Sequence, residues 1–420
     1  MRPLRVGIIG MGGFAAHHHN SILKPEKAGR CSVVCACDPE PAAFADRMVE
    51  LDFTGRGVRM FDDYVKMLDA CRDELDVVII PTPTPLHAEM HKACVERGLA
   101  VYLEKPPTLD YAELEQMLEV EAKARKMTNV GFNFIVEKPR QDLKRRILAG
   151  EFGQIKTVCY SGLWPRPIAY FQRASWAGRL MMGDQLVLDS CMGNAMAHYV
   201  HNTLFWAGGG ELFSWAEVAE VEAELYRAHN IEGADTLFVK ARTPSGPEIQ
   251  MALSHACDAP KRHREWVVCE KAEISYLTSA EYHIAWSDGR TEEGPVGDVE
   301  IADNLNAYFN YLQGEAERPM TRLVDSRPFV MMNDLAYVAA GKIAAIGSSH
   351  ITREPDPYGS TYVAINSIDS VFEEFFATGK FPSLQEVAWA QPGGRARAED
   401  VVKLRETIGA TLAANGQIPR

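Results

Sequence analysis

Two polar side chains, Lys105 and His198, are candidates for proton transfer during a reaction. Lys105 follows a short apolar segment, 99–103, that predicts a buried strand, and Glu104 and Pro106 flank it. Because proline restricts the residue before it, the backbone at Lys105 is expected to be extended. A lysine held there could donate a hydrogen bond to a reacting oxygen or exchange a proton with it. A surface lysine beside an ordinary surface glutamate is the alternative.

His198 lies in an Ala- and Met-rich segment, four positions after Asn194. If the chain is helical from Gly193, the two side chains lie one turn apart on the same face. An amide and an imidazole are unfavourable to bury on an apolar face without partners, and histidine exchanges a proton near neutral pH. We therefore predict that Asn194 and His198 are catalytic together with Lys105. A core histidine that contacts a backbone carbonyl is the alternative.

A glycine-rich segment near the N-terminus predicts the element that would hold a second reactant. The apolar run 4–9 predicts a parallel strand covered on both faces, and a helix is expected from Gly13. Between them, Gly10 allows a tight turn, Gly12 lets the backbone approach a pyrophosphate, and Ala15 takes the third small position. The free amide groups at the start of the helix would bind the anion. A strand-to-helix turn without a ligand is the alternative.

An acidic residue at the end of a second predicted strand favours NAD over NADP. The apolar run 31–37 ends in Asp38, at about the 20-residue interval from Ala15 where a carboxylate accepts hydrogen bonds from the ribose hydroxyls. A carboxylate there repels a 2′-phosphate, and no arginine follows before Arg47. Asp38 could instead cap the helix that starts at Pro39.

The alternation of strands and helices predicts an α/β domain with a doubly wound parallel sheet over residues 1–133. A proline-rich loop, 81–85, leaves the carboxyl end of the predicted strand 76–80, which is the edge where such sheets bind ligands. The remaining segments predict an α+β domain, 134–420, with a large, mostly antiparallel open sheet. We expect one face of that sheet to be free for a partner subunit.

Composition argues against several classes of partner. The net charge of −13 argues against nucleic acid and against an anionic membrane surface. The sequence has no apolar run of about 18 residues and no signal-like start, so we expect a cytoplasmic protein. The nine cysteines lack metal-ligand spacing and are expected to be buried thiols, while the histidines 17–19 would point in different directions on a helix. We therefore expect no metal site.

These motifs together resemble the Gfo/Idh/MocA family, which includes glucose-fructose oxidoreductase and inositol dehydrogenase. The resemblance implies an NAD-dependent oxidoreductase that transfers hydride between nicotinamide and a secondary hydroxyl of a sugar, glycoside or cyclic polyol. It also implies a homodimer or homotetramer joined through the C-terminal sheet. The residues that carry it are Gly10-Met11-Gly12 with Ala15, Asp38, Pro81-Thr82-Pro83 with His87, Glu104-Lys105-Pro106, and His198.

The spacing of the motifs and the resemblance together give the residues expected to contact each ligand. For the cofactor they are Gly10, Gly12, Gly13, Phe14, Ala15, Asp38, Pro81, Thr82, Pro83, His87, Glu104 and Lys105. On the substrate side, aromatic and arginine residues of one loop would stack on a sugar ring and bind its hydroxyls, although structural or interface roles are the alternative. The substrate residues are Trp164, Arg166, Tyr170, Arg173 and Trp176, with Lys105, Asn194 and His198.

Asn194 departs from the family pattern, which commonly has an acidic residue at this position. An amide can orient a histidine but cannot neutralise its cation, so whether Lys105 or His198 accepts the proton stays open. Two other functions also stay open. One is an NAD-dependent glycoside hydrolase or lyase that acts by transient oxidation and elimination. The other is a non-catalytic dinucleotide-binding regulator.

Overall fold

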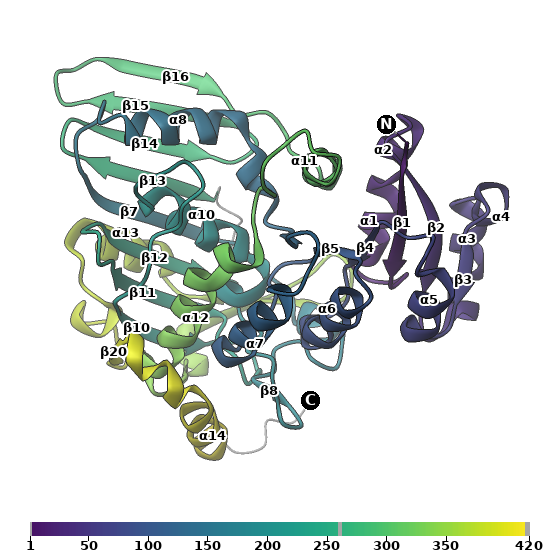
Figure 1. The fold of residues 1–420 in the computed structure, drawn as a ribbon. Coiled ribbons are helices and arrows are strands. Elements are labelled where there is room, and N and C mark those ends of the chain that lie inside the picture. The colour runs from purple at the N-terminus through teal and green to yellow at the C-terminus, as the bar shows by residue number, and fades with distance from the viewer. Residues whose placement is uncertain (1, 259–262, 416–420) are drawn as a thin grey trace. The chain divides into compact units, whose positions relative to one another are not determined.

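The computed structural model describes residues 2–258 and 263–415, and the chain divides into two compact units (Figure 1). Unit 1 consists of Met1–Thr108, Ala112–Glu137 and Val299–Arg327. Unit 2 consists of Leu109–Tyr111, Lys138–Asp298 and Pro328–Arg420.

Unit 1 is built on a six-stranded parallel sheet with the order β3-β2-β1-β4-β5-β6. The order reverses between β1 and β4, and ligands of doubly wound sheets bind at the carboxyl ends of the strands at such a point. The predicted doubly wound parallel sheet is therefore confirmed. The strands are β1 Leu4–Ile9, β2 Cys31–Cys37, β3 Arg59–Phe61, β4 Val77–Ile80, β5 Ala100–Leu103 and β6 Asn129–Val130.

The helices of this unit follow the predicted alternation. Asp63 caps α5 by accepting a hydrogen bond from the backbone N–H of Lys66 at 2.8 Å. The helix that follows β5 in the chain ends at Glu121. The helices are α1 Ala15–Ser21, α2 Leu23–Lys27, α3 Ala45–Glu50, α4 Phe53–Arg56, α5 Tyr64–Cys71, α6 His87–Glu96 and α7 Tyr111–Glu121.

A late segment of the chain returns to unit 1. Helix α11, Ile301–Leu312, buries Leu305, Tyr308 and Phe309 in the same core as β1 and β2. The Tyr308 hydroxyl donates to the Met127 carbonyl oxygen at 2.9 Å. The sequence predicts this segment in the second domain, 134–420, because helical periodicity reveals an apolar face but not the core that the face covers.

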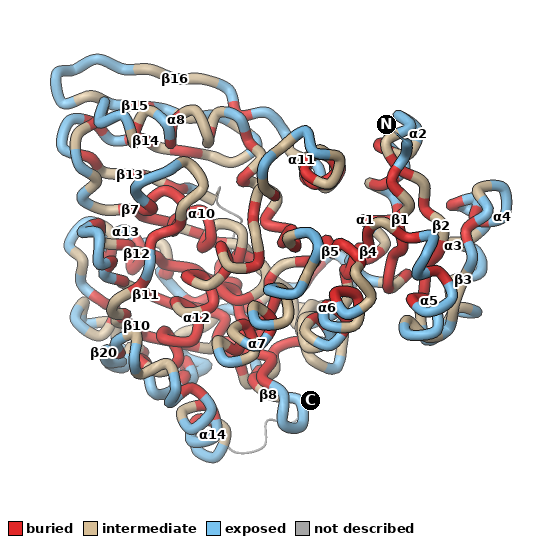
Figure 2. Tube along the Cα trace, in the orientation of Figure 1, coloured by how far each residue is buried: buried red, intermediate tan, exposed pale blue. Residues whose placement is uncertain are grey.

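Unit 2 contains a large mixed sheet with the order β16-β15-β14-β13-β7-β12-β11-β10-β17, in which β20 also pairs with β10. β7 runs parallel to β12 and β10 runs parallel to β17, while the other pairs are antiparallel. The predicted mostly antiparallel sheet is confirmed. Figure 2 shows its central strands largely buried and β16 largely exposed. The strands are β7 Ile155–Leu163, β10 Glu220–Arg227, β11 Thr236–Arg242, β12 Glu248–Ser254, β13 Arg264–Cys269, β14 Ala272–Leu277, β15 Glu281–Trp286, β16 Thr291–Pro295, β17 Ala344–Ala345 and β20 Gly394–Arg397.

Helices cover both faces of the centre of this sheet. On β12, the Met251 Sδ accepts a hydrogen bond from the Thr203 hydroxyl of α10. The next residue, Ala252, belongs to the same core cluster as Phe372 and Phe375 of α13. Because side chains alternate along a strand, α10 and α13 lie on opposite faces. The expectation of a face wholly free for a partner is therefore wrong over β11 and β12. The helices and the small hairpins are α8 Lys138–Leu148, α9 Ile168–Gln172, α10 Ala197–Ala207, α12 Arg327–Ala340, α13 Ile368–Thr378, α14 Leu404–Asn415, β8 Met181–Met182 with β9 Gln185–Leu186, and β18 Ile351–Pro355 with β19 Thr361–Ile365.

Candidate active site

The glycine-rich turn after β1 has the conformation that its sequence predicts. Gly10 and Gly13 have φ angles of +107° and +54°, which disfavour any residue with a side chain. A Cβ atom on Gly12 would lie 2.9 Å from the Phe44 ring, so close packing also requires a glycine there. In α1, which the structure describes in full, no side chain caps the N-terminus and the first turn holds no acidic residue. These features fit the binding of a pyrophosphate.

Asp38 lies against this turn. Its Oδ2 accepts a hydrogen bond from the Met11 N–H at 3.0 Å, and its Oδ1 accepts one from the Glu40 N–H at 3.1 Å. The first contact links the end of β2 to the glycine-rich turn. The second closes a local turn after β2, whereas the helical turn Pro41–Phe44, which the structure describes throughout, has no side-chain cap, so Asp38 does not cap it. The Asp38 carboxylate fits the ribose hydroxyls of NAD.

The three histidines of α1 have different environments. His17 is exposed, whereas His18 and His19 are buried. The His19 Nε2 lies 3.0 Å from the Gly10 carbonyl oxygen. Desolvation lowers the pKa of His19 to about 4, so the neutral ring donates its Nε2–H to that oxygen and holds the turn. The sequence predicts these histidines in a helix but does not indicate their partners.

His18 connects α1 to Glu104, the residue before the predicted catalytic lysine. The His18 Nε2 and the Glu104 Oε1 are 2.8 Å apart, and the other carboxylate oxygen accepts a hydrogen bond from the Lys105 N–H at 3.0 Å. Glu104 is only 4% exposed. A Cβ atom on Gly131 would lie 2.9 Å from its Oε1, so a glycine keeps that space open. Glu104 is therefore a buried group that holds the Lys105 backbone, and it is not a surface glutamate.

His87 connects the loops that follow β4 and β5. Its Nδ1 lies 3.0 Å from the Pro106 carbonyl oxygen and its Nε2 lies 2.8 Å from the Thr82 carbonyl oxygen. Burial lowers the pKa of His87. Since both ring nitrogens face main-chain oxygens, His87 can serve a cofactor site by holding Thr82 and Pro106 in place. Pro81 and Pro83 lie in the same loop as Thr82, and Phe14 is exposed at the start of α1.

The helix predicted from Gly193 is interrupted before His198. Cys191–Ala195 form a π-helical turn, Met196 leaves helical geometry with φ −103° and ψ 12°, and α10 begins at Ala197. The prediction of a single regular helix through Asn194 and His198 is therefore wrong. Side-chain bonds to this turn compete with regular helical hydrogen bonding, and π-turns are frequent at functional sites.

Asp189 orients Asn194. Its Oδ1 accepts a hydrogen bond from the Asn194 Nδ2 at 2.8 Å, and its Oδ2 accepts one from the Gly178 N–H at 2.6 Å. Because the amide nitrogen faces Asp189, the Asn194 Oδ1 is directed elsewhere. The buried Asp189 carboxylate thus bonds to the Asn194 side chain. The family pattern instead has its acidic residue at position 194 itself, four positions before His198.

The structure brings together all five residues predicted for the substrate loop. The Arg166 guanidinium lies 3.8 Å from the Trp164 ring centroid and 4.5 Å from that of Tyr170. The Arg173 guanidinium lies 3.8 Å from the Tyr170 centroid and 4.6 Å from that of Trp176. Rings and cations thus alternate in one stack, which we call the arginine–aromatic ladder. Such faces can bind the ring and hydroxyls of a sugar.

A second stack joins the start of α10 to the ladder. Tyr199 lies parallel to Tyr160, with centroids 5.1 Å apart, and to His263, with centroids 4.3 Å apart. The Tyr160 hydroxyl and the His263 Nδ1 are 2.7 Å apart, and the His263 ring contacts Trp164 at its edge. Desolvation lowers the pKa of His263 to about 4. His263 was not predicted, because no local sequence pattern indicates a contact 103 positions along the chain.

A lysine caps the other end of α10. The fully buried Lys144 Nζ donates to the carbonyl oxygens of Phe205, Trp206 and Gly208, at 2.5 Å and 3.2 Å for the first two. These are carbonyls at the end of the helix, where a cation is favourable. Desolvation lowers the pKa of Lys144 to about 7.

Glu265 anchors the middle of the same helix to α8 and β13. Its carboxylate makes a two-pronged ion pair with Arg140, at 2.6 Å and 3.1 Å, with both side chains fully buried. It also accepts hydrogen bonds from the Asn202 Nδ2 at 2.9 Å and the Trp206 Nε1 at 2.6 Å. The helix that carries His198 is therefore held at its middle and at its C-terminal end.

Comparison with known proteins identifies the first domain. Residues 4–132 match the family described as "Oxidoreductase family, NAD-binding Rossmann fold". Residues 4–132 thus match the NAD-binding domain of the Gfo/Idh/MocA family. The match confirms the family inferred from the motifs, the Rossmann domain and NAD as the predicted cofactor.

Curated relatives match a limited part of the chain. Inositol 2-dehydrogenase 4 of Saccharopolyspora erythraea is 31% identical over 156 residues, which span 36% of this chain and 43% of that protein. A glycosyl hydrolase family 109 protein of Shewanella amazonensis is 27% identical over 173 residues, or 37% of this chain and 36% of that protein. The chain spans less than half the length of these curated relatives.

Solved structures extend the likeness of fold to most of the chain. The WlbA dehydrogenase from Bordetella pertussis, in complex with NADH and UDP-GlcNAcA, is 22% identical and gives a TM-score of 0.63 over 80% of this chain and 96% of that chain.

Among residues 2–258 and 263–415, no helix has the length and apolar character needed to cross a membrane. All nine cysteines are buried free thiols, as predicted.

Proposed function

We propose that the protein is an NAD-dependent dehydrogenase that transfers hydride between nicotinamide and a secondary hydroxyl of a sugar, glycoside or cyclic polyol. The observation that carries the proposal is the buried Glu104, whose two oxygens hold the Lys105 backbone and His18 at the carboxyl edge of the Rossmann sheet. A lysine fixed at this edge of an NAD-binding domain suits hydride-transfer chemistry.

The residues of unit 1 that would hold NAD fit its parts. The turn Gly10–Ala15 would bind the pyrophosphate and Asp38 the ribose hydroxyls, and the same carboxylate would disfavour the 2′-phosphate of NADP. His87 and Glu104 would act through the loops that they hold, 81–83 and 105–106. When bound, NAD accepts the hydride from the substrate carbon.

The residues that act on the substrate divide into two groups. Lys105 and His198 would contact the reacting oxygen, one donating a hydrogen bond while the other accepts the hydroxyl proton. Asn194, oriented by Asp189, would form a hydrogen bond to the reacting oxygen or to the imidazole and so fix its orientation. The arginine–aromatic ladder would stack on the ring and bind its other hydroxyls.

We further propose that a homodimer or homotetramer would use strands β14–β16 of the sheet. Helix α13 reaches as far as β13, where the ring centroids of Trp266 and Phe376 are 4.7 Å apart. Beyond Trp266, the register places Ser275, His283 and Glu293 in one row across β14–β16. This row carries an exposed histidine and an exposed glutamate. The interface would therefore be polar and hydrated.

The test is to measure NADH absorbance and products with NAD and a panel of inositols, free sugars and glycosides. NADH that accumulates in step with a ketosugar supports the dehydrogenase. Lys105→Ala should then lower kcat by about 10² to 10⁴-fold, whereas Lys92→Ala, an exposed lysine on α6, should leave it unchanged. Near-normal turnover of Lys105→Ala would contradict the proposed role of the lysine.

The relative named as a glycosyl hydrolase favours testing a second candidate in the same experiment. An NAD-dependent glycoside hydrolase or lyase would cleave glycosides without net NADH, since the cofactor is regenerated in each cycle. NAD binding with neither NADH formation nor cleavage would instead support a non-catalytic dinucleotide-binding protein.

A further inference from the structure

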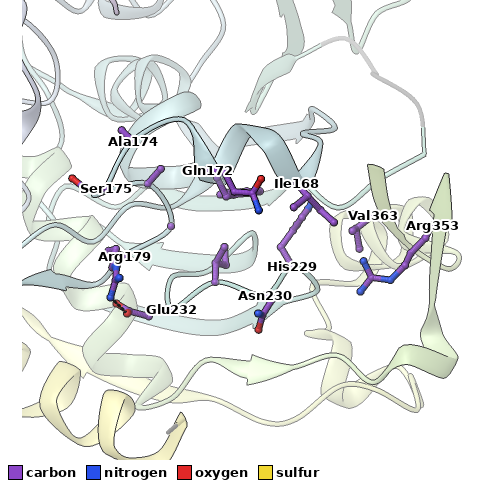
Figure 3. Close-up of a pocket in the computed structure, with 14 residues that line it drawn as sticks. Ile168, Gln172, Ala174, Ser175, Arg179, His229, Asn230, Glu232, Arg353 and Val363 are labelled. Carbon is purple, nitrogen blue, oxygen red and sulfur yellow. Dashed lines mark hydrogen bonds and ion pairs between the residues drawn. The ribbon is translucent and has the colours of Figure 1, made fainter. Parts of the chain in front are cut away.

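A cavity of about 560 Å³ lies within unit 2 (Figure 3). This volume is in the range of small-molecule sites. Its walls come from α9 and the segment 174–179, from the loop 229–232, and from the hairpin β18–β19. The lining residues that the structure describes include neither His198 nor any residue of the ladder. We call it the side cavity.

One part of the side cavity is apolar. Ile168 and Phe171 of α9, Ile231 and Val363 contribute hydrocarbon side chains to the wall. Gln172 adds an exposed amide that can donate to and accept from hydroxyl groups. The cavity therefore suits a compact molecule with a carbon ring or chain and a few hydroxyls.

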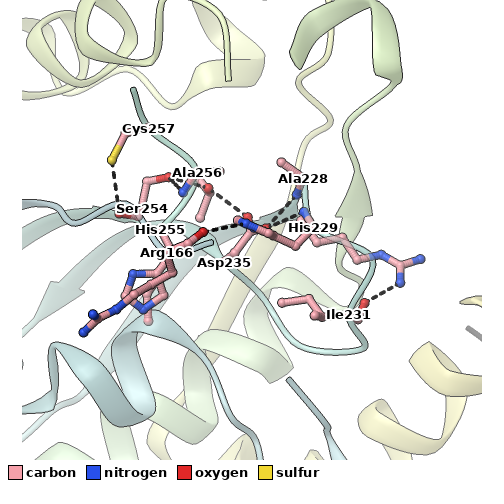
Figure 4. Close-up of polar contacts among 12 residues, drawn as sticks. Arg166, Ala228, His229, Ile231, Asp235, Ser254, His255, Ala256 and Cys257 are labelled. Carbon is pink, nitrogen blue, oxygen red and sulfur yellow. Dashed lines mark hydrogen bonds and ion pairs between the residues drawn. The ribbon is translucent and has the colours of Figure 1, made fainter. Parts of the chain in front are cut away.

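Arg179 and His229, two basic side chains of the wall, already have acidic partners. The Arg179 guanidinium pairs with the Glu232 carboxylate at 2.7 Å. The His229 Nδ1 lies 2.8 Å from the buried Asp235 carboxylate, and its Nε2 lies 3.0 Å from the Arg166 carbonyl oxygen (Figure 4). Both histidine nitrogens are thus used inside the wall, and the Arg179–Glu232 pair adds no net charge for a ligand.

Arg353 differs from these groups. It lies on β18, is exposed, and forms no ion pair within the described part of the chain. Figure 3 shows its guanidinium turned from the strand toward the cavity. An arginine of this kind binds carboxylates through two parallel hydrogen bonds. The side cavity thus presents one uncompensated positive charge beside an apolar wall.

We propose that the side cavity is a second ligand site, which binds a small hydroxylated organic acid of the sugar-acid class. The carboxylate of the ligand pairs with Arg353, its carbon skeleton lies against Phe171 and Ile231, and Gln172 binds a hydroxyl. This site is independent of the proposed hydride transfer, so neither result decides the other.

The test is calorimetric titration of the full chain with D-glucuronate, D-galacturonate and D-gluconate, with D-glucose as the neutral control. At least one acid should bind saturably and at least tenfold more tightly than D-glucose. Arg353→Gln should weaken that binding at least tenfold. Arg72→Gln, a matched exposed arginine in unit 1, should not change it. Binding equal in Arg353→Gln and wild type, or no saturable binding of any acid, would overturn the proposal.

Two further variants separate this site from the proposed active site. Lys105→Ala combined with His198→Ala should retain the acid binding, because neither residue lines the side cavity. Ala174→Phe should abolish it by filling the cavity, without relying on charge. Acid binding that is lost with Lys105 and His198 but survives Ala174→Phe would assign the acid to the active site and contradict the second site. Far-ultraviolet circular dichroism and Tm check that each variant is folded.

Discussion

The two units position their candidate functional groups by different physical means. In unit 1, Lys105 is held through hydrogen bonds among fully buried groups, with His18 and Glu104 at 2.8 Å. In unit 2, the predicted substrate residues are half-buried or exposed and are held by stacking, as Arg173 is on Tyr170. Buried hydrogen bonds specify one geometry, whereas stacked faces tolerate small displacements. The difference suggests a fixed reaction geometry in unit 1 and an adaptable ring-binding surface in unit 2.

The largest effect is expected from the buried pair in unit 1. His18→Ala removes the partner of Glu104 and frees the Lys105 backbone, and displacements of about 1 Å can lower turnover about 100-fold. Steady-state kinetics should show the loss mainly in kcat, with a smaller change in the KM for substrate. His18→Gln, which keeps a donor, should recover part of the loss.

The neighbouring His17 provides the matched control. It is exposed on the same helix, so His17→Ala should leave kcat and its pH profile unchanged. If His18→Ala retains full kcat while Glu104→Gln does not, the histidine is structural and only the carboxylate positions the lysine. An equal loss in both alanine variants would point to damage to α1 itself.

The histidine contacts also show what the sequence could and could not predict in unit 1. The strands and the glycine turn were predicted because each depends on neighbours along the chain, and Asp38 was predicted because it follows a strand at a characteristic interval from that turn. The partner of His18 was not, because Glu104 lies 86 positions away. Helical periodicity placed the histidines on α1 but carried no information about the strand end that they face.

In unit 2, the parts that were missed depend on contacts between distant segments. The sheet was predicted from alternation, yet α10 begins later than expected because Ser190 and Asp189 bond to the preceding turn. The covering of the sheet by α13 was missed for the same reason, since periodicity marks an apolar face but not its partner. The ladder residues were chosen by type and lie together, although their role in binding stays a prediction.

A smaller effect is expected from the stacked surface of unit 2. Arg173→Ala removes two ring contacts, and exposed cation–π contacts contribute about 0.5–1 kcal/mol each. The KM for the sugar substrate should rise about 5- to 30-fold, while kcat and the KM for NAD stay close to wild type. Arg173→Lys should have an intermediate KM. A loss confined to kcat would contradict the proposed adaptable surface and suggest that the ladder positions reacting groups.

The smallest effect concerns the anchor of α10, and it is a dependence on pH. Desolvation lowers the pKa of Lys144 to about 7 in the folded chain, against about 10.4 in an unfolded one. Between these pH values the unfolded state binds more protons, so the free energy of unfolding should rise with pH. One proton gives at most about 1.4 kcal/mol per pH unit, and the carbonyl oxygens of Phe205, Trp206 and Gly208 should reduce this slope by favouring the ammonium. Urea unfolding of wild type and Lys144→Met from pH 7 to 10 measures the difference, and the slope due to this lysine should be absent in the variant. Identical slopes would mean that Lys144 stays fully charged in the fold. The anchor of α10 would then rest on the charge of the lysine, and unit 2 would share with unit 1 a fixed, buried polar contact behind its candidate site.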